Sequence, residues 1–127
     1  MKYVLALSAL LFFCSCEKNT YVDFQIKNMS DTPIYVTGHD LIHNWAIKDT
    51  ILVGQEKNIA SWGKFGKDLN PFSPQGFFGD DLLIVNDLGD TSIKDYKVLN
   101  NWQVSIDDQR AVAYHTYILE IGNLDFN

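Results

Sequence analysis

Several short segments of this chain alternate apolar and polar side chains with a period of two. In the segment 21–27, YVDFQIK, the apolar side chains Val22, Phe24 and Ile26 are separated by polar ones. Successive side chains of a strand point to opposite faces, so this pattern predicts a half-buried strand. No segment shows the 3.6-residue apolar period of an amphipathic helix. The alternation therefore restricts the chain to a fold built from strands.

The segment 111–122, AVAYHTYILEIG, is the longest stretch of β-type sequence. Its alternation predicts a strand with one face formed by Ala113, His115, Tyr117, Leu119 and Ile121. The segment 34–37 follows turn-forming residues and is predicted to pair with 21–27 as a hairpin. A second hairpin is predicted from 50–53 and 58–62, with Ile51 and Val53 opposite Ile59 and Ser61.

A continuous apolar run in 81–87 fits a strand buried on both faces, and 93–99 and 102–106 are shorter candidates. The segment 38–49 fits either a helical turn capped by Asp40 or a loop that lays apolar side chains on the core. These segments predict an all-β protein. Residues 21–127 would form one antiparallel β-sandwich, immunoglobulin-like or transthyretin-like, with about seven or eight strands.

The N-terminal segment has the composition of a secretory leader. Lys2 precedes the apolar run 3–13, which as a helix would reach only about 17 Å. A bilayer core of about 30 Å needs a longer helix, so the run predicts a helical signal peptide and no membrane span. The run ends at Cys14, Ser15 and Cys16, and these are the only two cysteines of the chain. The folded domain is therefore predicted to have no disulfide framework, cysteine nucleophile or cysteine-based zinc site.

The stretch FCSC, residues 13–16, resembles the lipobox of bacterial lipoproteins, in which a small residue precedes the lipidated cysteine. The resemblance implies a signal peptide over 1–15, a diacylglyceryl thioether and an acyl chain such as palmitate on Cys16, and a polar tether over 16–20. The stretches IKNMSDTPIYV and YILEIGNLDF further resemble small Bacteroidota lipoproteins that carry one β-sandwich domain. That likeness implies an outer-membrane address, facing the periplasm or the cell surface.

The formal net charge of −6 argues against nucleic acid as a partner, because nucleic-acid sites need clustered lysine and arginine. It also argues against binding to anionic lipid by charge alone, so attachment to the lipid bilayer is expected to come from acylated Cys16. The sequence contains no phosphate-binding glycine motif and no G-x-S-x-G motif. We therefore predict no cofactor and no catalytic residue.

Two weak metal candidates stand against ordinary turn chemistry. His39 and His43 have the spacing of zinc ligands on a helix, and His115 would have to be the third ligand. Asp87 and Asp90 flank a glycine in NDLGD and could offer oxygens to calcium. Turn formation explains both groups without an ion and is the favoured interpretation.

The segment 63–80 holds four glycines and two prolines, a density that excludes regular structure and is typical of a functional or covering loop. Five aromatic side chains lie in or beside it: Trp62, Phe65, Phe72, Phe77 and Phe78. Exposed, they would form a binding platform for a sugar or a protein; buried, they would plug one end of the sandwich. The plug is the favoured interpretation, and Trp45 and Trp102 are expected in the core.

These observations predict a membrane-anchored envelope lipoprotein that acts as a non-catalytic binding or accessory module for a protein partner or a glycan. The alternative is a structural or assembly subunit of an envelope complex. A small hydrolase is the least favoured hypothesis.

Overall fold

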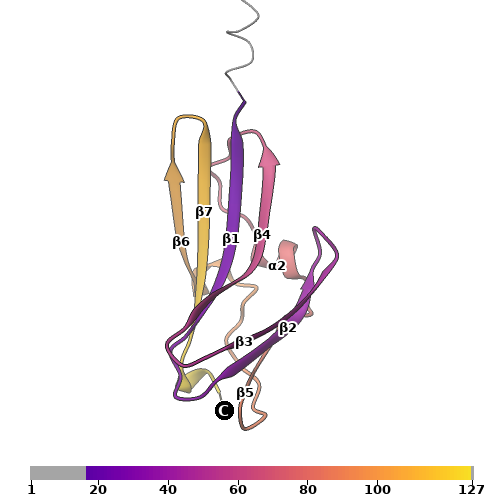
Figure 1. Ribbon diagram of the computed structural model, residues 1–127, viewed down its shortest axis with the longest axis vertical. Coiled ribbons are helices and arrows are strands. Elements are labelled where there is room, and N and C mark those ends of the chain that lie inside the picture. Colours follow the sequence, from indigo (N-terminus) through magenta and orange to yellow (C-terminus); the bar gives the residue numbers. More distant parts are fainter. Residues whose placement is uncertain (1–16, 127) are drawn as a thin grey trace, which may run out of the picture.

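Seven strands and one short helix make up residues 17–126, the part of the chain that the computed structural model describes (Figure 1). The larger sheet has the order β4-β1-β7-β6 and consists of β1 (Asn19–Asn28), β4 (Glu56–Phe65), β6 (Trp102–Asp108) and β7 (Val112–Ile121). The smaller sheet has the order β3-β2-β5 and consists of β2 (Ile34–Asp40), β3 (Trp45–Ile51) and β5 (Leu83–Asn86). The remaining elements are α2 (Pro74–Phe78) and two 3₁₀ turns, Leu99–Asn101 and Asn123–Asp125. The predicted all-β sandwich is confirmed.

The first and last strands are neighbours at the centre of the larger sheet. β1 and β7 pair in parallel, with Phe24 beside Tyr117, whereas every other pairing of named strands is antiparallel. The alternation predicted for 111–122 is confirmed, because one face of β7 is buried along its whole length.

The predicted hairpin between 21–27 and 34–37 is wrong, because the chain changes sheets there. β1 pairs with β4 and β7, and β2 pairs with β3 and β5. The buried side chain of Asn28 supports this crossing. Its Nδ2 donates to the carbonyl of Ile51 at 3.0 Å, and its Oδ1 accepts from the backbone N–H of Ser30 at 2.9 Å. Alternation specifies the face that a side chain occupies and leaves open which strand lies alongside.

The predicted hairpin between 50–53 and 58–62 is wrong for the same reason. β3 ends at Ile51 in the smaller sheet, and β4 begins in the larger one. Ile51 is buried, but Val53 is exposed on the connecting turn. Ile59 is the extra residue of a β-bulge in β4 and belongs to the core.

The segment 38–49 instead contains the end of one strand and most of the next. β2 and β3 pair as far as Asp40 and Trp45, and residues 41–44 form the turn between them. The prediction that 81–87 is buried on both faces is wrong, because Ile84 is buried while Leu83 is exposed.

The two weaker strand candidates have different outcomes. The segment 102–106 is confirmed as part of β6. Residues 93–99 lie outside the named strands, and the two residues before them form isolated bridges, Thr91 with Val85 and Ser92 with Phe126.

Phe24 lies at the centre of the core. Its ring centroid is 4.7 Å from that of Phe77, 5.0 Å from Phe78, 5.6 Å from Trp102 and 4.8 Å from Tyr117. These rings come from α2, β6 and β7, so the cluster joins the larger sheet to the helix that leads toward the smaller one. Trp102 is a core residue, as predicted.

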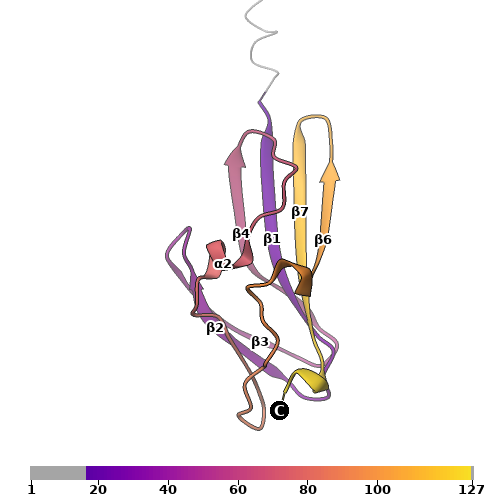
Figure 2. The same ribbon diagram turned by 180° about the vertical axis from the view of Figure 1, so that it is seen from behind.

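The two sheets diverge toward the end of the molecule at which β1 begins, and the segment 66–73 runs across the inner face of the larger sheet there (Figure 2). Polar side chains of the sheet hold this segment in place. The hydroxyl of Thr20 donates to Gly66 O at 2.7 Å, and His115 Nε2 lies 2.6 Å from Asp68 O. The hydroxyl of Tyr117 accepts from Phe72 N at 2.8 Å. The glycine- and proline-rich loop thus covers the part of the larger sheet that the smaller sheet does not reach.

Ionic contacts reinforce the same loop. The carboxylate of Asp68 accepts from Lys64 Nζ at 2.8 Å and from the backbone N–H of Asn70 at 2.9 Å. These two hydrogen bonds, that from Lys64 first, lower the pKa of Asp68 below its usual range. Burial raises the pKa of the Tyr117 hydroxyl, which therefore stays protonated at neutral pH.

Replacing Phe24 with alanine is expected to destabilise the fold by about 3–5 kcal/mol, because it leaves a cavity between four rings. Denaturant unfolding monitored by circular dichroism measures the effect. The matched control is Phe65→Ala, at a ring that is 88% exposed, for which a change within about 0.5 kcal/mol is expected. Similar losses for the two variants would contradict the central position of Phe24.

Candidate binding groove

The structure separates the five aromatic side chains of the candidate binding loop. Phe77 and Phe78 are buried in the core. Trp62 and Phe72 are partly buried against it and meet edge to face, with their centroids 5.2 Å apart. Only Phe65 is largely exposed. The plug interpretation therefore holds for Phe77 and Phe78 and in part for Trp62 and Phe72, and the five rings do not form one exposed surface.

Trp45 was expected in the core, and this prediction is wrong because its side chain is 64% exposed. Trp45 lies directly opposite Asp40, in line with Ile47 and Ile51 on the face of β3 that points inward. The β2–β3 hairpin, however, extends beyond the edge of the larger sheet (Figure 1). The alternation thus predicts the correct face for Trp45, but no opposing strand covers that face at the hairpin tip.

Asp40 fixes the conformation of this tip. Its Oδ1 accepts from the backbone N–H of Ile42 at 2.8 Å and of His43 at 3.1 Å, and its Oδ2 lies 2.6 Å from His43 Nδ1. Asn44 then takes a left-handed conformation with φ of 57°, which asparagine tolerates better than most residues. The sequence had suggested Asp40 as a cap, and it does cap this turn, although the turn is not a helix.

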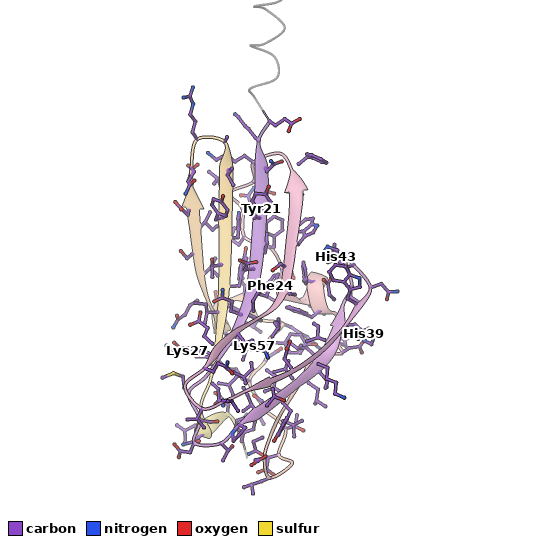
Figure 3. The ribbon with its side chains drawn as sticks, in the orientation of Figure 1. Tyr21, Phe24, Lys27, His39, His43 and Lys57 are labelled. Carbon is purple, nitrogen blue, oxygen red and sulfur yellow. The ribbon has the colours of Figure 1, made fainter. Side chains whose placement is uncertain are left out.

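The turn brings His43 against Trp45. Their ring centroids are 4.5 Å apart and the planes are inclined by 16°, so the imidazole stacks on the indole. Figure 3 shows His43 at the projecting tip of the hairpin. The stack restricts the rotation of the indole. Trp45 is still mostly exposed, so apolar ring surface stays accessible to a ligand.

A groove of about 290 Å³ lies beside this stack, between the edge strands β3 and β4. Its walls come from one segment of each strand and the residue that precedes the turn: Asp40, Trp45, Ala46, Ile47, Asn58, Ile59, Ala60 and Ser61. The groove exists because the two sheets diverge and leave two neighbouring edges without a strand between them. A pocket with apolar walls and a few polar groups is the usual form of a small-ligand site.

Polar side chains of the larger sheet are linked along the β4 wall. Ser61 Oγ donates to Asp23 Oδ1 at 2.6 Å, and Asn58 Nδ2 donates to Ser61 Oγ at 2.6 Å. All these hydrogen bonds are exposed, so each group can still exchange a bond with a ligand or with water. The groove therefore offers donors and acceptors on one wall and an aromatic ring on the other.

The structure does not bring the weak zinc candidates together. His39 is on β2 and His43 is bonded to Asp40, while His115 is buried on β7 against Asp68 O and the hydroxyl of Tyr117. Within residues 17–126, no group of three or more histidine, cysteine, aspartate or glutamate residues has a geometry that could hold a metal ion.

The weak calcium candidates are engaged in different contacts, Asp87 with a neighbouring strand and Asp90 within its own turn. Asp87 Oδ1 accepts from the hydroxyl of Tyr35 at 2.7 Å, and this bond raises the pKa of Tyr35. The side chain and the backbone N–H of Asp90 both bond to the side chain of Asn86. Asp90 therefore has the local role that turn chemistry gives it, whereas Asp87 is bonded to β2.

Cys16, the predicted lipidation site, lies outside the described residues. Among the residues that are described, no helix is long and apolar enough to cross a membrane. Comparison with known protein families, with curated proteins and with solved structures found no match to this chain.

Replacing Asp40 with alanine is expected to loosen the hairpin tip and lower the free energy of unfolding by about 1–2 kcal/mol, because two backbone N–H groups lose their acceptor. Chemical denaturation measures the loss. Asp81→Ala, at an exposed acid near the same hairpin, is the control and is expected to change stability by less than about 0.5 kcal/mol. If Asp40→Ala were as stable as the control, Asp40 would not hold the turn.

Proposed function

We propose that this protein is a lipid-anchored envelope module that binds a glycan in the groove beside Trp45. The observation that carries the proposal is the exposed indole, stacked on His43 at the rim of a groove with polar groups on its opposite wall. A sugar ring has an apolar face of C–H groups and a rim of hydroxyls. An aromatic ring and a short row of donors and acceptors complement these two surfaces.

The polar wall supports a neutral ligand. Asn58 and Ser61 each carry both donor and acceptor capacity, as sugar hydroxyls do. Asp23 does not line the groove itself, but it accepts from Ser61, and its negative charge disfavours an anionic ligand near this wall. A neutral oligosaccharide is therefore the ligand class that the groove suits best.

One observation favours a protein partner as the alternative. Leu41 and Ile42 are exposed at the same hairpin tip as Trp45. Aliphatic side chains around an aromatic anchor are typical of a protein interface. In that case the hairpin tip would be the contact surface of a subunit in an envelope complex.

The lipid anchor is tested by replacing each cysteine with serine. Cys16→Ser is expected to shift the protein from the membrane fraction to the soluble fraction, because stable anchoring needs the acyl chains. Cys14→Ser, two residues away in the leader, is the matched control and is expected to leave the protein in the membrane fraction. Membrane association of Cys16→Ser with continued incorporation of labelled palmitate would contradict the assignment.

Glycan binding is tested with the full chain, solubilised in detergent, on an array of neutral and acidic oligosaccharides. Trp45→Ala is expected to weaken binding at least about tenfold, which corresponds to about 1.4 kcal/mol. Phe65→Ala removes an exposed aromatic ring at a different end of the molecule and is expected to leave binding unchanged.

Equal binding by the two variants would contradict the proposal that the groove beside Trp45 binds the glycan. The protein-partner alternative would be supported if no oligosaccharide bound and an envelope protein were retained by wild type and lost by Trp45→Ala.

A further inference from the structure

Three segments meet at the end of the larger sheet where β1 begins, and we call this region the tether end: residues 17–21, 63–68 and 107–114. Asn19 pairs with Phe65 on one side and with Val112 on the other. The carbonyl of Lys18 accepts from Gly66 N at 2.7 Å, and Lys67 Nζ donates to Gln109 O at 2.7 Å. These contacts hold the start of β1, the end of β4 and the β6–β7 turn together (Figure 1).

The tether end exposes three aromatic rings. Phe65 is 88% exposed, Tyr21 is 45% exposed and Tyr114 is 43% exposed. Tyr21 and Tyr114 stack on the outer face of the sheet with centroids 5.7 Å apart and an interplanar angle of 22°. A groove of about 280 Å³ over Gly63 lies between Tyr21 and Phe65. Phe65 packs on none of the other aromatic rings among residues 17–126, so its exposure needs a separate explanation.

The charge of the tether end differs from that of the rest of the domain. Its basic and acidic side chains are equal in number: Lys18, Lys64, Lys67 and Arg110 against Glu17, Asp68, Asp107 and Asp108. Lys64 is paired with Asp68, and Lys67 with Asp108. The other described residues carry five basic and twelve acidic side chains. An anionic membrane surface therefore repels the body of the domain and does not repel this end.

We propose that the tether end contacts the bilayer interface, with Phe65 as its apolar anchor and the tyrosine pair at headgroup depth. The inference rests on the proposed acylation of Cys16. Three residue steps separate Cys16 from Asn19, and a fully extended chain covers about 3.3–3.6 Å per step, or about 10 Å in all. The polar interface of one leaflet is itself about 5–8 Å thick. The tether therefore keeps Phe65 within reach of the headgroups.

The chemistry of the exposed rings fits that position. Tyrosine is enriched at membrane interfaces because its ring is apolar and its hydroxyl is polar, and phenylalanine adds buried apolar area. Contact at this end orients the long axis of the larger sheet away from the membrane. The β2–β3 hairpin projects from the side of the molecule farther along that axis, so the groove stays open to solvent (Figure 3).

The orientation is tested with the acylated full chain in vesicles of phosphatidylethanolamine and phosphatidylglycerol. Cleavage before Cys16 removes Cys14 and acylation converts the thiol of Cys16 to a thioether, so one introduced cysteine can be labelled uniquely with a fluorescent dye. Arg110→Cys places the dye at the tether end, and Leu124→Cys places it at a 90% exposed position in the turn Asn123–Asp125. This turn lies beside the C-terminus, at the opposite end of the molecule (Figure 1). The quencher is a phospholipid with a nitroxide close to its glycerol.

The dye at position 110 is expected to be quenched and the dye at position 124 to be unaffected. Adding Phe65→Ser is expected to reduce quenching at position 110 at least about twofold, because this ring is the most exposed of the three aromatic rings at the tether end. Leu124→Ser, an equally exposed apolar residue, is the matched control and is expected to leave the quenching unchanged.

Flotation of the vesicles separates the two proposals. If the protein floats with the vesicles but both dye positions are quenched alike, or if Phe65→Ser has no effect, the interfacial contact is wrong and the anchor stands. If wild type fails to float, the acyl anchor is wrong and the contact that rests on it is overturned as well.

Discussion

The packing of four aromatic rings around Phe24 is the interaction on which the other features of the structure depend. It draws α2 against the centre of the larger sheet and so fixes the path of the loop on either side of that helix. Phe77 and Phe78 are both buried against Phe24. The helix can be this short because burial of those two rings stabilises it, and helix propensity contributes little.

Because α2 lies against the centre of the larger sheet, the inner face of that sheet is covered differently on the two sides of the helix. Toward the C-terminal end of β1, strands of the smaller sheet cover it with apolar side chains. Toward the other end, a loop covers it and the inner face becomes polar, with Thr20 and His115 bonded to loop backbone. A loop exposes unpaired carbonyl and N–H groups, and buried polar side chains satisfy them. The divergence of the sheets that requires this loop also opens the groove beside Trp45.

The alternating segments predicted the all-β sandwich and the buried face of β7 correctly, because a period of two reports burial directly. The partners of β1 and β4 could not be predicted, because the β1–β2 and β3–β4 connections pass from one sheet to the other. The sequence of a turn does not reveal which sheet the next strand joins. Trp45 shows the same limit at the site. Its neighbours Ala46 and Ile47 suggested the core, and the face was correct, but exposure depends on how far the opposing sheet extends. The lipid anchor at Cys16 and the envelope address stay predictions.

The proposed binding groove depends on which tryptophan side chains meet solvent, and this can be measured without a ligand. Solvent paramagnetic relaxation enhancement by a soluble gadolinium chelate, read at the indole N–H signals, compares Trp45 with Trp102. We expect strong enhancement for Trp45 and almost none for Trp102, whose Nε1 donates to Tyr96 O at 2.7 Å in the core. A Trp45 signal as protected as that of Trp102 would contradict the projecting hairpin and the groove beside it.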